Sequence, residues 1–293
     1  MKKAPVPELE RLSTDTYTAS SVEHLHRYAM AADLCRGKDV LDIASGEGYG
    51  SNLLANLSNS VTGVDISTDV IEHASAKYVR PNLRFLQGSA DAIPLPTGSV
   101  DAVVSFETLE HHDKHEEMLR EIKRVLRGNG MMIISTPDKL SYSDIPQYKN
   151  EYHVKELYLD EFTALVQRFF KRHRLLFQGL LYGTFITPER DWTGFAYYRG
   201  DFEACEAVQY VSRHDYNIAI ASDGELPEIG VSFFDGNQVL RDFKRLVAEE
   251  RRHASNLEYR LHSLEKVLRD VEHSLAYRLG RSLSWPVRLL RSR

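Results

Sequence analysis

The chain has 293 residues, of which 27% are charged and 42% hydrophobic, and its formal net charge is −5. This balance excludes the strongly basic surface that nucleic-acid-binding domains use, so we expect no nucleic-acid partner. No apolar run approaches the roughly 20 residues that span a bilayer, and none follows the N-terminal lysines as in a signal peptide. The only two cysteines lie far apart, which argues against a disulfide framework. We therefore expect a cytoplasmic protein with one large domain and an appendage.

The first part of the chain alternates short apolar runs with amphipathic segments of helical length. Residues 1–36 are expected to form a helical cap with a helix at 20–34, and residues 37–230 a larger domain. Strands are expected at 38–43, 60–66, 83–88, 100–106 and 130–135. Helices are expected at 49–57, 68–79 and 115–126, with Asp69 capping the second and Gly128 and Gly130 ending the third. This alternation predicts an α/β fold with a doubly wound, mostly parallel sheet.

The rest of the large domain is expected to close the sheet around an insertion. A helix is predicted at 157–170 and two closing strands at 172–179 and 216–222, with an aromatic insertion at about 181–213 between them. The insertion contains Trp192 and several tyrosines, whose flat faces suit stacking against sugar rings, although they also fit the core of the insertion itself. Few basic residues accompany them, which argues against an RNA acceptor.

The C-terminal part has a different pattern. Leucines and valines spaced by threes and fours predict a long helix with a coiled-coil seam at 237–276, and hence a homo-oligomer. Glu250 and His253 occupy seam positions, so a helix packed back on its own domain stays open as an alternative. Residues 277–293 form a basic amphipathic tail, which suits an anionic membrane face. The alternative is a disordered basic end.

The stretch VLDIASGEGYGS, residues 40–51, places glycines directly after a strand. Gly46 and Gly48 allow a ligand to approach the backbone, although a purely structural turn uses glycine too. A dinucleotide site would read G-x-G-x-x-G, whereas here Asp42 and Glu47 would repel a pyrophosphate and suit an ammonium or sulfonium group. Asp65, about 20 residues on, ends the second strand, where an acid binds the hydroxyls of a ribose.

These motifs, in this order, resemble the class I S-adenosylmethionine-dependent methyltransferases over residues 20 to about 180. Within that class they resemble the small-molecule branch of sugar and quinone O-methyltransferases, including those of bacterial surface-polysaccharide (O-antigen) clusters. The resemblance implies a Rossmann-like sheet of seven strands whose last strand is antiparallel, with S-adenosylmethionine as cofactor. It implies a cofactor-binding set that is listed here: Asp42, Ala44, Gly46 and Gly48 for the methionine part, Asp65 with Ile66 for the ribose, Ser89, Ala90 and Asp91 for the adenine, and Phe106 for the floor. Arg27 lies one helical turn from Glu23 and is predicted either to bind the cofactor's carboxylate or to form a surface ion pair.

The segment after the fourth strand carries the candidate chemistry. If it turns helically, Glu107, Glu110 and His111 share one face. This trio resembles the metal-binding stretch of ubiquinone-pathway and small-RNA 2'-O-methyltransferases, which implies Mg²⁺, or a softer ion such as Mn²⁺ because one ligand is histidine. It also resembles sugar methyltransferases in which a histidine at the position of His111 is a general base without metal, and this interpretation is favoured. A helix cap with solvated acids is the third alternative. His153 is a second candidate for base or metal ligand, or a structural loop histidine.

The sequence therefore predicts an O-methyltransferase. The expected acceptor is a sugar hydroxyl in a bacterial surface glycan or its precursor, such as lipopolysaccharide O-antigen, and the basic tail would hold the enzyme on the inner membrane face or against a glycan-assembly partner. One alternative is an O-methyltransferase of a quinone or another lipophilic phenol. The other is a non-catalytic scaffold for glycan assembly, against which the complete set of loop glycines and acids argues.

Overall fold

The computed structural model describes residues 12, 14, 19–181, 197–200, 205–208, 214–237, 239, 252, 257, 260, 261 and 263. The chain divides into two compact units, Met1–Gly236 and Asn237–Arg293. In the second unit the few described residues are helical. The predicted coiled-coil seam at 237–276 lies mostly outside the described residues, and the basic tail at 277–293 lies wholly outside them, so both stay predictions.

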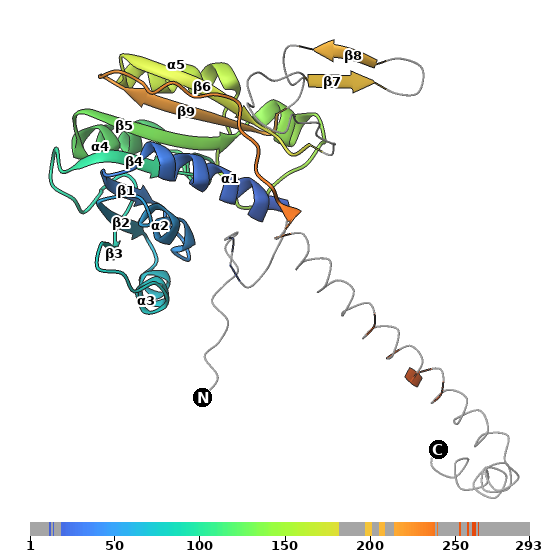
Figure 1. The fold of residues 1–293 in the computed structure, drawn as a ribbon, viewed down its shortest axis with the longest axis horizontal. Helices are drawn as coiled ribbons and strands as arrows, with labels where there is room; N and C mark the ends of the chain where they lie inside the picture. The colour runs from blue at the N-terminus through green and yellow to red at the C-terminus, as the bar shows by residue number, and fades with distance from the viewer. Residues whose placement is uncertain are drawn as a thin grey trace, which may run out of the picture. The chain divides into compact units, whose positions relative to one another are not determined.

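The first unit is built on a seven-stranded sheet with the order β3-β2-β1-β4-β5-β9-β6, which Figure 1 shows from bottom to top. The strands are β1 (Asp39–Ile43), β2 (Ser60–Asp65), β3 (Leu83–Gln87), β4 (Val100–Ser105), β5 (Leu126–Pro137), β6 (Arg172–Gln178) and β9 (Tyr216–Ser222). Strand β9 pairs antiparallel with both β5 and β6, while the remaining pairs are parallel. The predicted seven-stranded sheet with an antiparallel last strand is therefore confirmed.

Helices cover both faces of this sheet. They are α1 (Ala19–Leu34), α2 (Tyr49–Leu54), α3 (Thr68–Lys77), α4 (His115–Val125) and α5 (Leu159–Phe169). Alternate residues of each strand enter opposite cores, because strand side chains alternate between faces. In β5, for example, Met131 and Ile133 pack with α1 and α2, whereas Met132 and Ile134 pack with α4 and α5. The buried runs read in the sequence are thus strands covered on both faces.

Two predicted helix ends differ from the structure. Ser67 is the N-cap of α3, and Asp69 lies within the first turn, where its charge still favours the helix dipole. Helix α4 ends at Val125, because Leu126 is extended and pairs with Val100. Gly128 and Gly130 therefore belong to β5 and do not form a helix cap.

The insertion contains an element that the sequence did not predict. Strands β7 (Tyr197–Gly200) and β8 (Cys205–Val208) pair antiparallel as a two-stranded sheet. Trp192 and Tyr210 lie outside the described residues, so their stacking role stays a prediction. Among the helices that the structure describes, none is both long and apolar enough to cross a membrane.

Candidate functional site

The turn after β1 has a backbone that only certain residues adopt. Ala44, Gly46 and Gly48 have φ angles of 59°, 53° and 93°, in the left-handed region. A Cβ on Gly48 would also lie 2.9 Å from both Ala74 of α3 and Phe85 of β3. Glycine at position 48 is therefore required by conformation and by space, and the loop passes close to its neighbours.

Asp65 joins this turn to the end of β2. It is 4% exposed, and its carboxylate accepts hydrogen bonds from the backbone N–H groups of Gly46 and Ser67, both at 3.0 Å. The next residue, Ile66, exposes its apolar side chain. Both residues lie at the carboxyl edge of the sheet, at the end of β2. A fixed acid beside an exposed apolar side chain suits a ribose with its attached base.

The two other acids, Asp42 and Glu47, both bind groups of the protein itself. Asp42 is fully buried and accepts hydrogen bonds from Ser51 Oγ (2.6 Å) and Tyr28 Oη (3.2 Å). Burial raises the pKa of Asp42 to about 6 despite these hydrogen bonds. Its carboxylate therefore connects the end of β1 to α1 and α2.

Glu47 does not point a free charge at a ligand, in contrast to the prediction from sequence. Its carboxylate pairs with Lys77 and also accepts hydrogen bonds from Tyr78 Oη (3.1 Å) and Thr14 Oγ1 (2.9 Å). Of the two acids predicted to repel a pyrophosphate, Glu47 is therefore neutralised within the protein, and the argument rests on Asp42 and on the spacing of the glycines.

The loop after β3 holds the predicted adenine-binding residues. Ser89 Oγ donates to Asp91, and Lys114 Nζ lies 2.5 Å from Asp91 Oδ2. The Lys114 hydrogen bond, with that of Ser89, lowers the pKa of Asp91 to about 2, so the carboxylate is charged. Ala90 lies between them and packs partly against the core. Ser89 and Lys114 thus hold the carboxylate of Asp91 in place at this edge of the sheet.

Arg27 is buried in α1 with only 1% of its surface exposed, which excludes the surface ion pair with Glu23. Its Nη1 donates to Gln178 Oε1 at 2.8 Å and lies 3.6 Å from Glu107 Oε1. Its guanidinium carbon is 4.7 Å from the ring centre of Tyr216. Its Nε and Nη2 have no hydrogen-bond partner among the described residues. These two N–H groups form one edge of the planar fork, which matches a carboxylate in bidentate geometry.

Phe106 and Glu107 follow the end of β4, next to Arg27. Phe106 is buried edge-on against the ring of Tyr28, with centroids 5.0 Å apart. Glu107 has a φ of 52°, an uncommon value for a residue other than glycine, and accepts a hydrogen bond from Ser135 Oγ at 2.6 Å. The side chain of Glu107 lies beside Ser135 and Arg27.

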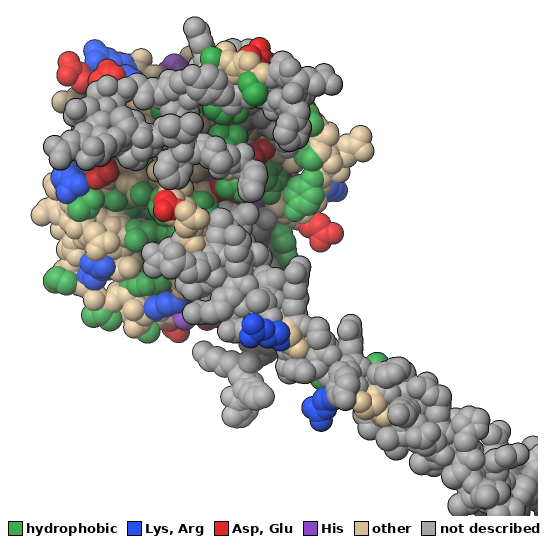
Figure 2. Space-filling model, turned by 45° about the vertical axis from the view of Figure 1, so that its right-hand side comes forward, with side chains coloured by type: hydrophobic (Ala, Val, Ile, Leu, Met, Phe, Trp, Pro, Cys, Tyr) green, Lys and Arg blue, Asp and Glu red, His purple; other side chains and the backbone are tan. Residues whose placement is uncertain are grey.

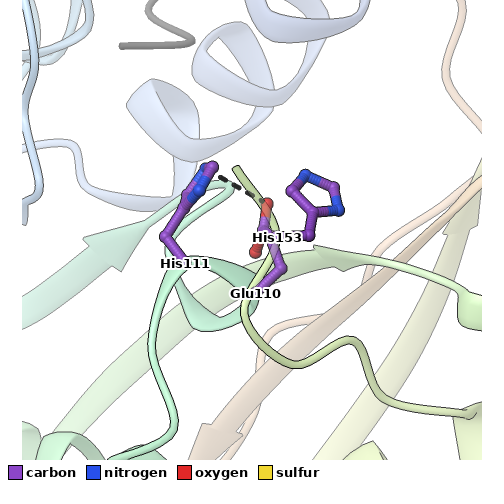
Figure 3. Close-up of side chains that lie close together, drawn as sticks. All are labelled: Glu110, His111 and His153. Atoms are coloured by element: carbon purple, nitrogen blue, oxygen red, sulfur yellow. Dashed lines mark ion pairs between the residues drawn. The ribbon is translucent and has the colours of Figure 1, made fainter. Parts of the chain in front are cut away.

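The structure assembles a different trio from the one predicted. Glu110, His111 and His153 each offer a ligand atom within 4.8 Å of the others, and Figure 3 shows the two imidazoles on either side of the Glu110 carboxylate. The segment forms only a short 3₁₀ turn, Leu109–His111, so Glu107 does not share a helical face with Glu110. His153 joins the trio because Val154 N–H donates to Glu110 O at 2.7 Å and fastens the two segments together.

The two histidines differ in how their nitrogens are used. His111 Nδ1 faces the carbonyl of Tyr152 at 3.1 Å, so Nδ1 carries the proton, and Nε2 lies 4.0 Å from Glu110 Oε1. His153 Nδ1 pairs with Glu156 (2.5 Å) and its Nε2 with Asn150 Nδ2 (3.1 Å). His111 therefore presents a lone pair, whereas both nitrogens of His153 are engaged.

Glu110 is buried, and this burial, with the nearby Glu107 charge, raises the pKa of Glu110 well above its ordinary value. Its carboxylate accepts a hydrogen bond from Thr136 Oγ1 at 3.3 Å. A positive charge arising nearby would lower that pKa and be stabilised in turn. The third alternative, a cap with solvated acids, is wrong for Glu110.

Sequence reasoning missed the residues that hold this site in place. They are Tyr28 and Ser51, which donate hydrogen bonds to Asp42 from α1 and α2, and Gln178 and Tyr216, which contact Arg27 from the far end of the domain. No local pattern marks them, because the contacts exist only after the sheet has formed.

Comparison with known proteins finds methyltransferases that are similar to part of this chain. A family model described as a methyltransferase domain matches residues 41–134. A protein of Mycobacterium tuberculosis, named a probable S-adenosylmethionine-dependent methyltransferase, is 37% identical over 142 residues, which cover 47% of this chain and 50% of that protein. A fatty-acid O-methyltransferase of Mycolicibacterium smegmatis is 30% identical over 138 residues, which cover 46% of this chain and 49% of that protein. The chain thus spans about half the length of these curated relatives.

A solved structure extends the match to the fold. The S-adenosylmethionine-dependent methyltransferase of Thermotoga maritima superposes with a TM-score of 0.50 at 16% identity, over 69% of this chain and 90% of that one. Residues 41–134 therefore match a methyltransferase domain, and the described sheet and helices share the fold of the class I S-adenosylmethionine-dependent methyltransferases.

Proposed function

We propose that this protein transfers a methyl group from S-adenosylmethionine to an oxygen of its acceptor, with His111 as general base. The observation that carries the proposal is the meeting, at one sheet edge, of the glycine turn and Asp65 with an imidazole whose Nε2 is available. A cofactor site and a proton acceptor at the same edge are what such a reaction needs.

The residues present fit the cofactor. Arg27 keeps two buried N–H groups without a partner among the described residues, and leaving them so costs about 1–3 kcal/mol each. The carboxylate of the cofactor would satisfy both in bidentate geometry. Asp65 would accept the ribose hydroxyls and Asp91 the amine of the adenine. Asp42, near the end of β1, would supply negative charge for the methionine ammonium.

In this proposal the protein itself only removes a proton from the acceptor and stabilises the charge that results. When bound, the cofactor would supply an activated methyl group, because its sulfonium sulfur can leave as a neutral thioether. His111 Nε2 would take the proton of the acceptor's hydroxyl as that oxygen receives the methyl group. The carbonyl of Tyr152 holds the ring by Nδ1, and the Glu110 carboxyl, 4.0 Å from Nε2, stabilises the imidazolium. The proton then passes to water.

A divalent ion is the second candidate for this site. Glu110, His111 and His153 have a suitable separation, and two nitrogen ligands would favour Mn²⁺ over Mg²⁺. To bind an ion, however, His153 would have to give up Asn150 or Glu156. The base role requires no such rearrangement, and we favour it.

Histidine variants separate the two roles. His111→Ala should lower kcat about 10²-fold or more and leave S-adenosylmethionine affinity nearly unchanged, since a general base contributes about that much. His173→Ala, in β6, is the matched control and should behave as wild type. Metal dependence, tested with a chelator and restored with Mn²⁺, would assign the metal role instead. Full activity of His111→Ala without metal dependence would refute both.

The class of acceptor is a separate part of the proposal. The glycan acceptor rests on the aromatic insertion and the basic tail, much of which lies outside the described residues. A lipophilic acceptor is supported by the match to the fatty-acid O-methyltransferase. Assays with nucleotide sugars, lipid-linked glycans and phenols distinguish the two classes. The coiled-coil oligomer and the attachment of the tail to the inner membrane face are further proposals, and a scaffold without activity would bind the cofactor and methylate none of these acceptors.

A further inference from the structure

Residues 140–154, whose Tyr152 carbonyl contacts the His111 ring, also expose several apolar side chains. We define the apolar rim as Leu140, Ile145, Tyr148, Tyr152 and Val154, all of which are at least 44% exposed. They come from one stretch that begins directly after β5 and contains a short π-helix, Leu140–Asp144. Exposed apolar side chains scattered singly are normal, but a local concentration of them marks a binding surface.

The rim is continuous with the proposed site. The Tyr152 carbonyl is the partner of His111 Nδ1, and Val154 N–H donates to the backbone of Glu110. Between them, the ring of Tyr142 stacks on His153 at 5.5 Å and meets Tyr148 edge-on at 5.7 Å. A path of rings therefore leads from the imidazoles to the exposed surface.

A second strand end extends this surface. Phe177, at the end of β6, and Leu180, just beyond it, are also more than half exposed. Asp215 N–H donates to Gln178 O, and Asp138 N–H donates to Asp215 O, so the ends of β6, β9 and β5 lie in sequence along one edge. Figure 2 shows hydrophobic side chains at the surface of the first unit, among charged ones.

The charge of the segment narrows the choice of occupant. Residues 139–156 contain three lysines and three acids, so they carry no net positive charge. Lys139 lies over the ring of Tyr158, 4.7 Å from its centre. A surface for an anionic membrane would carry an excess of lysine or arginine. A neutral apolar surface that begins at the base suits the hydrocarbon chain of the molecule whose oxygen lies there.

We propose that the apolar rim binds a hydrocarbon chain of the acceptor, so that the substrate class is amphiphilic: a hydroxyl or phenol oxygen at His111 and an alkyl or isoprenoid chain across the rim. The proposal rests on the proposed function, because it places the acceptor oxygen at His111. It assigns the rim residues to specificity rather than to the chemical step.

The test uses the full chain and alkyl 4-hydroxybenzoates from butyl to dodecyl as probes. Binding is measured by calorimetry with S-adenosylhomocysteine present, so that no turnover is needed. A methylene that buries half its area on an open surface gains roughly twofold in affinity, so octyl should bind more than about tenfold more tightly than butyl. In the double variant Ile145→Ser with Val154→Ser, this ratio should fall to about twofold or less.

Val79→Ser is the matched control, since Val79 is an exposed valine, 83% against 64% for Val154, in the turn between α3 and β3. It should keep the chain-length dependence, and thermal melting should show all variants folded. The proposal is wrong if the wild-type affinity does not depend on the chain length of the probe. It is also wrong if the double variant keeps the wild-type dependence on chain length. Equal rates of nucleotide-sugar methylation by wild type and double variant, without chain-length dependence, overturn it too.

Failure of the proposed function looks different. If the chain-length dependence is present but no probe or sugar is ever methylated, the rim stands and the methyltransferase activity fails. If short phenols are methylated and longer chains bring no gain, the activity stands and the rim fails.

Discussion

Asp42 gives a prediction whose size follows from the structure. Its carboxyl is fully buried, and burial raises its pKa from 3.8 to about 6. This pKa difference of about 2.2 corresponds to about 3 kcal/mol in the free energy of unfolding. The folded state binds this proton more tightly than the unfolded state does. The resulting stabilisation of the folded protein is therefore fully present at a pH below the unfolded pKa of 3.8. It is lost as the pH rises to about 6. Above that, the folded protein bears the whole cost of a buried carboxylate.

The perturbation is Asp42→Asn, which keeps the shape and removes the charge. Urea unfolding of both proteins is measured from pH 2 to pH 8 without cofactor, and the two free energies of unfolding are subtracted. The subtraction removes the titration of all other groups. The variant should gain about 3 kcal/mol relative to wild type between pH 3 and pH 7, and the difference should then stay constant.

Asp91→Asn is the control of opposite sign. Hydrogen bonds from Lys114 and Ser89 depress its folded pKa to about 2, so its contribution is present above its unfolded pKa and is lost as the pH falls. Asp91→Asn should therefore lose stability relative to wild type as the pH rises from 2 toward 4. An Asp42→Asn difference that is flat with pH would refute the claim that this buried carboxylate is destabilised.

The remaining predictions concern binding, backbone and assembly. Asp65→Ala should weaken S-adenosylmethionine binding by about 1.5–3 kcal/mol in calorimetry, through lost charge-assisted hydrogen bonds, and unchanged affinity would remove Asp65 from the site. Arg27→Lys keeps the charge but not the fork and should weaken the same binding about tenfold; equal affinity would mean that the buried N–H edge has no ligand. Gly48→Ala should cost about 2 kcal/mol or more in urea unfolding, since φ is 93° and the Cβ meets Ala74 and Phe85; a smaller loss would show that the turn relaxes. Truncation after Gly236 should leave a monomer by light scattering that still binds cofactor and has lost affinity for anionic liposomes; a monomeric full-length chain would contradict the coiled coil, and equal liposome binding the membrane role of the tail.

Much of the fold was predictable because its signals are local. Each strand of the parallel core is a short buried run, and the turn from Ala44 to Gly48 lies wholly within one strand–helix connection. Asp65 follows at the end of the next strand, and adjacent parallel strands end at the same edge. The order of the motifs along the chain is therefore enough to determine where they meet.

The partners of these residues were not predictable. Lys77 neutralises Glu47 only because α3 packs beside the turn, and Arg27 is buried only because Gln178 and Tyr216 arrive from the far end of the domain. In the trio around Glu110 and His111, His153 is present in place of the predicted Glu107, again because of contacts between distant segments. A 3₁₀ turn replaced the assumed helix, and a backbone hydrogen bond from Val154 brought a distant loop to Glu110.

The central claim is that this sheet edge is an S-adenosylmethionine site, and the most direct measurement is a calorimetric titration of the full chain. The protein should bind one equivalent of S-adenosylmethionine with micromolar or tighter affinity and give no heat with NAD. No binding of S-adenosylmethionine at millimolar concentration, or binding of NAD in its place, would contradict the account.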